Sequence, residues 1–235
     1  MAEPLLFIPG HMQDARAFLP QMVALGAGRS VQVFTCDADS VERLSEQALA
    51  GAPTRFAVIG HGLGGNVALD ILRRAPERIS RIVLLATDPL SEAPQVAAAR
   101  EARMVAARAG RLKQAIAEDV PDAALADTPD REALKLLLRD MAYGLGEGVY
   151  LRQCKALQRR PDQQKTLRRT LLPALFIVGE MDTVVPVRRQ EFARDLMPNS
   201  ALRVIAGAGH LPMLEEPEAV TEAIATFLSD PMILR

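Results

Sequence analysis

The chain has 235 residues, of which 49% are hydrophobic and 24% charged, and its formal net charge at pH 7 is −1. This composition is ordinary for a globular protein that folds as one domain or as one domain with an insertion. The near-neutral charge and the 4% aromatic content argue against nucleic acid or an anionic membrane as a partner. No apolar run approaches the roughly 20 residues of a membrane span, and we expect no signal peptide.

The two cysteines bear on location and on metal binding. Cys36 and Cys154 lie far apart in the sequence and belong to no C-x-x-C motif. We therefore expect neither a disulfide framework nor a zinc site, and we interpret both as small apolar residues without chemistry. The same cysteine usage favours a reducing, cytoplasmic location.

Short apolar runs alternate with helical patterns outside the middle of the chain. The expected strands lie at residues 5–8, 31–34, 56–59, 82–86, 175–178 and 202–205. The expected helices lie at residues 14–25, 41–50, 66–74, 187–196 and 217–228. This alternation is typical of βαβ units and predicts an α/β fold, with a mostly parallel sheet of about six strands and helices on both faces.

The segment from residue 89 to residue 171 shows no evident strand. Its helical patterns lie at about residues 93–109, 111–119, 129–143, 148–160 and 162–170. We interpret residues 89–171 as a helical insertion, and residues 1–88 and 172–235 as the α/β core. An insertion after the fourth strand lies over the C-terminal edge of the sheet, where open α/β sheets bind ligands.

One stretch combines a strand, a sharp turn and a helix. In FAVIGHGLGG (residues 56–65) the turn has the spacing of the nucleophile elbow, G-x-S-x-G, with Gly62 at the serine position. Glycine at positions 60 and 64 lets the strand and the helix approach closely. The central residue of such a turn usually needs a positive φ, which glycine tolerates at little cost. Gly62 therefore suits the turn but supplies no oxygen for catalysis.

An acid and a histidine follow later strands. Asp182 lies in GEMD after the fifth expected strand, and His210 lies in GAGH after the sixth. Both positions are at the same edge of a parallel sheet as the elbow. The chain order of elbow, acid and histidine is the order found in α/β-hydrolases, and it differs from the order in other serine hydrolase folds.

Over essentially its full length, the chain resembles the α/β-hydrolase superfamily, and within it the small bacterial 3-oxoadipate enol-lactonases and related esterases. The resemblance is carried by LLFIPGHMQDA (5–15), FAVIGHGLGGNVAL (56–69), APERISRIVLL (75–85), VGEMDTVVP (178–186) and AGAGHLPMLEEP (206–217). It implies a hydrolase that acts on a small carboxylic ester or lactone and needs no cofactor. The sequence likewise has no G-x-G-x-x-G after the first strand, no P-loop and no metal-ligand cluster.

The resemblance also implies a role for each site residue. Asp182 is the acid and His210 is the general base. The backbone N–H groups of Leu63 and His11 form the oxyanion hole, a role that tolerates a change of side chain. Residues 89–171 form a helical cap that covers the pocket, and side chains of this cap, which the sequence does not identify, shape substrate specificity.

The sequence departs from the family pattern at three places. Gly62 replaces the nucleophilic serine. Pro9-Gly10 replaces the usual His-Gly after the first strand, a milder change that still allows a tight turn. We also expect the chain to enter directly at what is usually the third strand, without the antiparallel N-terminal hairpin of many members.

Gly62 leaves three hypotheses open. In the first, serine is the natural residue and this chain is an engineered inactive variant. In the second, Gly62 is natural, and His210 with Asp182 acts directly as a base on water or on a substrate proton, as in related lyases and cofactor-free dioxygenases. In the third, the protein binds a small molecule without converting it. Loss of the serine from a comparable triad lowers turnover on the order of 10⁶-fold.

Other residues are weaker candidates. Asp88 follows the fourth strand and is an alternative acid, although the GEMD context favours Asp182. We expect His61 to be buried beside the elbow in a structural role, and the side chain of His11 to lie near the entrance and contact substrate. A basic stretch, opposed by Asp162 alone, either attracts a carboxylated substrate or, as we favour, forms a solvated helix face. Its members are Arg152, Lys155, Arg159, Arg160, Lys165, Arg168 and Arg169.

Overall fold

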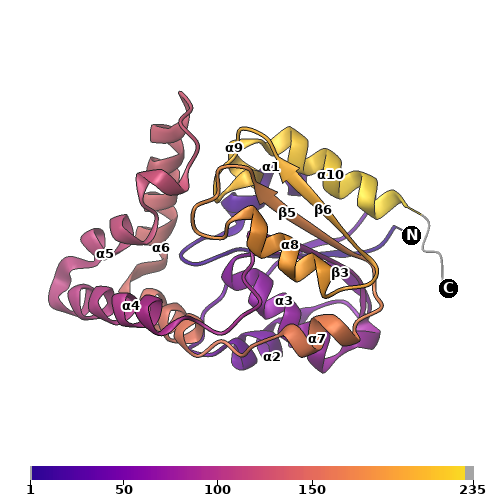
Figure 1. Ribbon diagram of the computed structural model, residues 1–235, viewed down its shortest axis with the longest axis horizontal. Helices are drawn as coiled ribbons and strands as arrows, with labels where there is room; N and C mark the ends of the chain where they lie inside the picture. Colours follow the sequence, from indigo (N-terminus) through magenta and orange to yellow (C-terminus); the bar gives the residue numbers. More distant parts are fainter. Residues whose placement is uncertain (1, 231–235) are drawn as a thin grey trace.

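The computed structural model describes residues 2–230, which form one six-stranded sheet with helices on both faces (Figure 1). The strands are β1 (Leu5–Ile8), β2 (Val31–Val33), β3 (Phe56–His61), β4 (Ile79–Leu85), β5 (Ala174–Gly179) and β6 (Ser200–Ile205). Their order across the sheet is β2-β1-β3-β4-β5-β6, and every neighbouring pair is parallel. The predicted α/β sheet of six strands is confirmed.

Alternate residues of each strand point into two separate hydrophobic layers. In β1, Leu6 and Ile8 face one layer, and Leu5 and Phe7 face the other. The helices of the first layer are α2 (Val41–Gly51), α3 (Leu63–Arg74), α7 (Gln164–Arg169) and α8 (Val187–Asp195). The helices of the second layer are α1 (Leu19–Leu25), α9 (Pro212–Glu215) and α10 (Pro217–Ser229). Burial on both faces explains why the central strands are continuous apolar runs in the sequence.

The first predicted helix is divided in two. A 3₁₀ turn (Ala15–Phe18) comes first, and the side chain of Asp14 caps it by accepting from the N–H of Arg16. The α-helix α1 begins only at Leu19, with Pro20 in its first turn. Proline has no N–H to continue a hydrogen-bond ladder from the preceding turn, so it favours a new helix start at this point.

Between β4 and β5 the described chain contains helices and no strand. These elements are α4 (Pro94–Ala106), η3 (Ala107–Arg111), α5 (Leu112–Asp119), η4 (Asp122–Ala124), α6 (Arg131–Gln158) and α7. Helices α4, α5 and α6 stand together to one side of the sheet, at the left of Figure 1, and share a hydrophobic cluster that also contains Met12 from the loop after β1. Helix α7 packs on the core, where Leu167 is buried in the layer of α3, and Ala156 and Leu157 near the end of α6 lie in the same layer.

Helix α6 unites two helices that the sequence predicts separately, at 129–143 and 148–160. It runs for 28 residues, but Gly146 has φ 79° and ψ 176°, outside the helical region. The glycines between residues 144 and 148 therefore produce a kink, as expected where a residue without a Cβ adopts a positive φ.

Cys36 and Cys154 are both buried and free. Burial raises the pKa of the Cys36 thiol to about 12, so this group stays protonated at neutral pH. In the part of the chain that the structure describes, no helix is both long enough and apolar enough to cross a membrane.

Candidate active site

The turn after β3 adopts a sharp elbow. Gly62 has φ 51° and ψ −112° and immediately precedes helix α3. Its N–H donates to the carbonyl oxygen of Leu85 at the end of β4 (3.1 Å), and its own carbonyl oxygen accepts from the side chain of Asn66 (3.1 Å). The elbow is thus fixed at the C-terminal edge of the sheet, between the ends of the central strands. The positive φ that the sequence predicts for Gly62 is confirmed.

The glycines of the elbow have different physical roles. A Cβ atom at Gly64 would overlap the carbonyl oxygen of Ile8, and one at Gly60 would lie 2.5 Å from the carbonyl oxygen of Gly64. These two positions need glycine because strand and helix touch there. A Cβ atom at Gly62 would meet no atom within 4 Å. Only the backbone conformation disfavours a side chain at Gly62, and the space in front of it is open.

His210 and Asp182 form a hydrogen-bonded pair. The distance from His210 Nδ1 to Asp182 Oδ2 is 3.0 Å, and the carboxylate of Asp182 is completely buried. Its other oxygen, Oδ1, accepts from the N–H groups of Val184 (2.8 Å) and Val185 (2.9 Å). These two donors hold the carboxylate in place, so it can orient the imidazole and keep the proton on Nδ1.

The loops that carry the pair are tied together. The N–H of Met181 donates to the carbonyl oxygen of Ala208 (2.9 Å). The carboxylate of Glu215 accepts from the N–H groups of Gly209 (2.9 Å) and Leu211 (2.8 Å), on either side of His210. Glu215 therefore fixes the backbone of the histidine loop.

The segment around η4 packs directly against both loops. The N–H of His210 donates to the carbonyl oxygen of Ala124 (2.7 Å), and the hydroxyl of Thr183 donates to that of Ala123 (2.9 Å). Glu215 also accepts from the N–H of Ala126 (2.7 Å). The helical segment after β4 thus contributes backbone groups to the surroundings of the acid and the histidine.

His61 lies between the elbow and the histidine loop. Its Nε2 is 3.0 Å from the carbonyl oxygen of His210, its Nδ1 is 3.1 Å from Oε1 of Gln13, and its ring centroid is 5.0 Å from that of His210. Burial, reinforced by the neighbouring His210, lowers the pKa of His61 to about 3. A neutral, buried His61 that supports the loop agrees with the structural role predicted for it.

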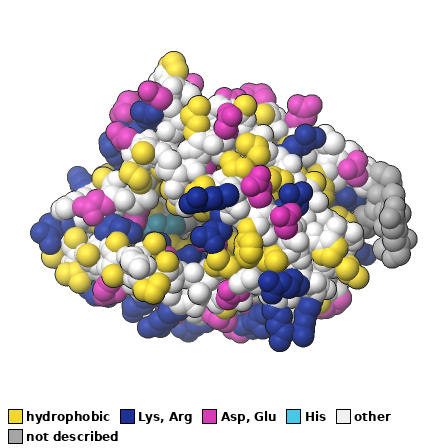
Figure 2. Space-filling model, viewed as in Figure 1, with side chains coloured by type: hydrophobic (Ala, Val, Ile, Leu, Met, Phe, Trp, Pro, Cys, Tyr) yellow, Lys and Arg dark blue, Asp and Glu magenta, His cyan; other side chains and the backbone are white. Residues whose placement is uncertain are grey.

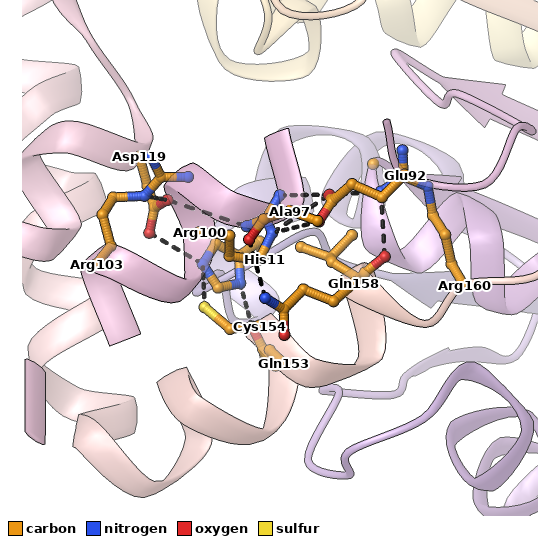
Figure 3. Close-up of polar contacts among 12 residues, drawn as sticks. His11, Glu92, Ala97, Arg100, Arg103, Asp119, Gln153, Cys154, Gln158 and Arg160 are labelled. Carbon is orange, nitrogen blue, oxygen red and sulfur yellow. Dashed lines mark hydrogen bonds and ion pairs between the residues drawn. The ribbon is translucent and has the colours of Figure 1, made fainter. Parts of the chain in front are cut away.

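His11, in the loop after β1, has protein partners at both ring nitrogens (Figure 3). Nε2 lies 3.2 Å from Oδ2 of Asp119, and Nδ1 lies 3.1 Å from Oε1 of Gln153. Residues of α5 and α6 thus already bind the side chain of His11, and its predicted contact with substrate stays a prediction. Burial alone lowers the pKa of His11, but the hydrogen bond and charge of Asp119, with a smaller effect of Cys154, raise the pKa to about 9.

Asp119 links His11 to a wider network of charges. Arg103 Nε lies 2.7 Å from Asp119 Oδ1, while Arg100 (2.9 Å) and Arg160 (2.7 Å) both contact the buried carboxylate of Glu92 (Figure 3). Burial alone raises the pKa of the Asp119 carboxyl, but His11 and the two nearby arginines, Arg103 and Arg100, outweigh it and lower the pKa to about 2.

The two backbone donors proposed for the oxyanion hole belong to the loop after β1 and to the first residue of α3. Within residues 2–230, no backbone or side-chain acceptor pairs with the N–H of His11 or of Leu63. The neighbouring N–H groups are occupied, since Gly10 donates to Gln13 (3.0 Å) and Met12 donates to Gln153 (2.7 Å). Neither candidate donor is therefore paired with a protein acceptor in the described part of the chain.

A cavity of about 100 Å³ opens beside this loop. Figure 2 shows a histidine side chain deep in a hollow between α4–α6 and the core, with lysine and arginine side chains close by. Apolar side chains make up much of the wall, which also carries two cations, Lys135 and Arg139, and two carboxylates, Asp119 and Asp122. The cavity is lined by His11, Met12, Gln13, Ile116, Ala117, Asp119, Val120, Asp122, Lys135, Leu138, Arg139 and Ala142.

The weaker candidates have other partners. Asp88 accepts from the N–H of Leu90 (3.1 Å) and lies 3.6 Å from Arg189, whereas Asp182 is the acid that contacts His210. Most of the basic stretch is solvent-exposed, as in the interpretation that we favour, but Arg160 is bound to Glu92. Among residues 2–230, no group of three His, Cys, Asp or Glu side chains is arranged to hold a metal ion.

Four residues of this site have no role in the sequence interpretation: Gln13, Asp119, Gln153 and Glu215. Glu215 has the clearest signal, because a carboxylate five residues after the histidine stands just before Pro217 and the start of a helix. Asp119 and Gln153 have no such signal, since both come from helices and meet the loop after β1 only through the tertiary fold.

Comparison with proteins of known sequence supports the same fold. The biotin biosynthesis bifunctional protein BioHC of Teredinibacter turnerae is 28% identical over 255 aligned residues, which cover 95% of this chain and 44% of that protein. This chain thus spans less than half the length of that relative. A pimeloyl-[acyl-carrier protein] methyl ester esterase of Aliivibrio fischeri is 23% identical, with 87% of this chain and 80% of the relative covered.

Solved structures resemble this chain along nearly its whole length. An esterase from Thermogutta terrifontis has a TM-score of 0.87 at 23% identity, covering 97% of this chain and 90% of the other. An enol-lactonase from Burkholderia xenovorans has a TM-score of 0.84 at 20% identity, covering 98% and 92%. The profile of the Alpha/beta hydrolase family matches residues 5–223. The chain therefore belongs to the Alpha/beta hydrolase family.

Proposed function

We propose that this site is built to hydrolyse a small carboxylic ester or lactone, with His210 as the general base, Asp182 as the acid that orients it, and Gly62 at the empty nucleophile position. The observation that carries the proposal is the His210–Asp182 hydrogen bond of 3.0 Å beside a well-formed elbow. The esterases and the enol-lactonase among the similar proteins support the class of substrate.

Residues 89–171 are proposed to act as the cap of this site, with residues 1–88 and 172–235 as the core. The contacts of Ala124 and Ala126 with the histidine loop, and the cavity between the loop after β1 and helices α5 and α6, support this role. Since α7 and the C-terminal end of α6 pack on the core layer, we assign the covering part to α4, α5 and the rest of α6. Side chains of these helices that line the cavity would select the substrate.

The proposed chemistry follows from the hydrogen bonds. Asp182 accepts a hydrogen bond from the Nδ1–H group of His210, which keeps this proton on Nδ1 and leaves Nε2 with a lone pair that can take a proton from an attacking hydroxyl or water. Attack on the ester carbonyl places negative charge on its oxygen. The unpaired N–H groups of Leu63 and His11 would stabilise that charge in a site partly shielded from water.

Gly62 removes the covalent step from this scheme. No side-chain oxygen is present to form an acyl-enzyme, and loss of the nucleophile lowers turnover on the order of 10⁶-fold in a comparable triad. A serine at this position fits sterically, because a Cβ atom there meets no atom within 4 Å. We therefore expect Gly62→Ser to supply the one missing group.

The decisive experiment compares this chain with Gly62→Ser on a panel of short-chain aryl esters and lactones. We expect the serine variant to gain several orders of magnitude in turnover, with burst kinetics that report an acyl-enzyme. Gly62→Ala is the matched control, because it introduces the same backbone strain without the oxygen. A folded serine variant that shows neither a burst nor turnover above the control would contradict the proposal.

The open space in front of Gly62 favours a second candidate function, in which a water molecule takes the place of the serine oxygen. His210 would then act as a base on that water or on a proton of the substrate. We expect His210→Ala to abolish any slow turnover by the unaltered chain, and Gly62→Ala to reduce it because a methyl group fills the space. Recovery of a bound ligand unchanged after long incubation would instead identify a binding protein.

A further inference from the structure

The charge of His11 can be derived from the arrangement of its neighbours (Figure 3). The amide of Gln153 has a fixed orientation, because its Nε2 donates to the carbonyl oxygen of Cys36 (2.6 Å) and its Oε1 accepts from the N–H of Met12 (2.7 Å). Rotating the amide by 180° would break both bonds. Its oxygen therefore faces Nδ1 of His11 at 3.1 Å and accepts a hydrogen bond when this nitrogen carries a proton.

The second nitrogen faces a charged acceptor. Nε2 of His11 lies 3.2 Å from the carboxylate of Asp119, whose lowered pKa keeps it ionised at neutral pH. A carboxylate accepts hydrogen bonds and donates none, and its full negative charge favours a proton on Nε2 in addition to the one on Nδ1, whereas both acceptors around His61 are neutral. With both nitrogens protonated, the side chain of His11 is an imidazolium.

Groups from three helices face this imidazolium. Asp119 comes from α5, and Cys154 (Sγ 3.9 Å from Nε2) and Tyr150 (ring centroids 5.4 Å apart) come from α6. From α4, Arg103 contacts Asp119 at 2.7 Å and Arg100 approaches it at 4.0 Å, and both oppose a further cation. Asp119 contacts His11 directly at 3.2 Å, whereas the contacts of the two arginines are with Asp119.

The same helices hold the next residue of the loop. Met12 has φ 52°, which is unusual for a residue other than glycine, and its side chain is buried with Met104, Ile116 and Tyr150 in the cluster of α4–α6. A strained backbone of this kind persists only where surrounding contacts over-determine it. His11 and Met12 together therefore attach the loop after β1 to the insertion.

We propose that His11 is a positioning residue: as an imidazolium bound to Asp119 and Gln153, it fixes its own backbone N–H at the oxyanion position. Gln153 also occupies the N–H of Met12, which leaves the N–H of His11 as the free donor of this pair. The oxyanion role rests on the proposed function above, whereas the charge state and the attachment of the loop do not. In this arrangement the insertion sets the geometry of a donor that belongs to the core.

The charge state is tested by ¹⁵N NMR of protein labelled at histidine. The chain has only 3 histidines, so single substitutions assign every signal. We expect His11 to show two protonated ring nitrogens at pH 7.5 and to titrate near pH 9. Asp119→Asn should lower this titration by about two pH units, while Asp140→Asn, at an exposed pair with Arg16, should leave it unchanged.

A neutral His11 at pH 7.5, or a titration midpoint near the ordinary 6.5, would overturn the proposal. The titration of the unaltered chain gives this result even where Asp119→Asn fails to fold. Retention of the imidazolium in folded Asp119→Asn would overturn the role of Asp119 in holding it.

The positioning role is tested in the Gly62→Ser background. Loss of an oxyanion donor lowers kcat by about 10²-fold, so we expect Asp119→Asn to lower kcat and kcat/KM together, with KM little changed. The kcat of Gly62→Ser should also fall as pH rises past 9. An unchanged kcat in Asp119→Asn and a flat profile at pH 9 would refute positioning. An inactive Gly62→Ser would count against the proposed function, while the NMR result would still decide the charge state of His11.

Discussion

Two histidines, the buried His61 at the elbow and the half-buried His11 at the junction with the insertion, show how neighbours decide charge. Each has an oxygen near both ring nitrogens, at 3.0 to 3.2 Å. The oxygens around His61 are neutral amide oxygens, and its pKa falls to about 3. One of the oxygens around His11 belongs to the carboxylate of Asp119, and the pKa of His11 rises to about 9.

The comparison extends to the regions around them. The elbow is held by close contact of backbone atoms, because Gly60 and Gly64 leave no room for a side chain. The junction is held by ion pairs, because the largely buried carboxylate of Asp119 contacts both His11 and Arg103 there. The number of hydrogen bonds is therefore a poor guide to charge. What matters is whether one acceptor carries a full negative charge to offset the cost of burying a cation.

Breaking the elbow should have the largest effect on stability. Gly64→Ala puts a Cβ atom onto the carbonyl oxygen of Ile8, and neither backbone can move without disrupting β1 or α3. We expect a loss of about 4 kcal/mol in the free energy of unfolding, or no folded protein at all. Gly62→Ala, in open space, should cost only about 1 kcal/mol, from its positive φ. Urea denaturation of both variants checks this, and equal losses would show that close packing does not govern the elbow.

Titration of the unfolding free energy should separate the two histidines. The raised pKa of His11 stabilises the fold fully below pH 6.5, and this stabilisation is lost as pH rises through about 9. The lowered pKa of His61 acts in the opposite sense: the unfolded chain takes up a proton below pH 6.5 that the folded chain refuses, so stability falls toward acid. The free energy of unfolding should fall by about 3 kcal/mol from pH 6.5 to 9, the alkaline limb of the curve. It should fall by a similar amount from about pH 6.5 to 4, the acid limb.

Single variants should remove one limb at a time. His61→Gln is expected to flatten the acid limb and to leave the alkaline limb in place. Asp119→Asn is expected to do the reverse, at the cost of lower stability near neutral pH. Chemical denaturation at half-unit pH intervals provides the measurement. A chain whose two limbs respond equally to both variants would show that other groups dominate the pH dependence.

Glu215 joins the loop of His210 to the insertion, and its loss should have a smaller effect. Its carboxylate accepts from three N–H groups, two beside His210 and one at Ala126 of the insertion. Glu215→Gln removes the negative charge and places the amide NH₂ group of the glutamine against a backbone N–H group. We therefore expect the free energy of unfolding to fall by about 2 kcal/mol and amide exchange to become faster at Gly209 and Leu211. The neighbouring Glu216→Gln is the matched control. Equal exchange rates in both variants would contradict the proposed clamp.

The sequence predicts the fold and the core of the site because their signals are local. Continuous apolar runs mark the buried parallel strands, and glycines mark the elbow. The positions of Asp182 and His210 after strands predict that they meet at one edge of the sheet, and they lie 3.0 Å apart. Because all the strands are parallel, residues that follow different strands lie at the same edge of the sheet.

The partners of the His11 side chain could not be predicted from local sequence signals. Asp119 and Gln153 are separated from it by 108 and 142 residues, and each stands in a helix with no motif around it. Contacts of this kind depend on how α5 and α6 pack, which hydrophobic periodicity does not specify. The side chain of His11 is consequently assigned to substrate by sequence position, whereas its nearest partners are protein groups.

The burial of Met12 among the side chains of α4–α6 has a consequence for engineering by recombination. Caps are natural units to exchange between related hydrolases, because one insertion between two strands can be cut and joined at its ends. Here the side chain of Met12, in the loop after β1, is buried among α4, α5 and α6, the helices that we propose as the cap. A chimera that imports new α5 and α6 helices would leave His11 and Met12 with foreign neighbours. Residues 10–13 and the cap should therefore be inherited as one block, although 75 or more residues of core sequence separate them.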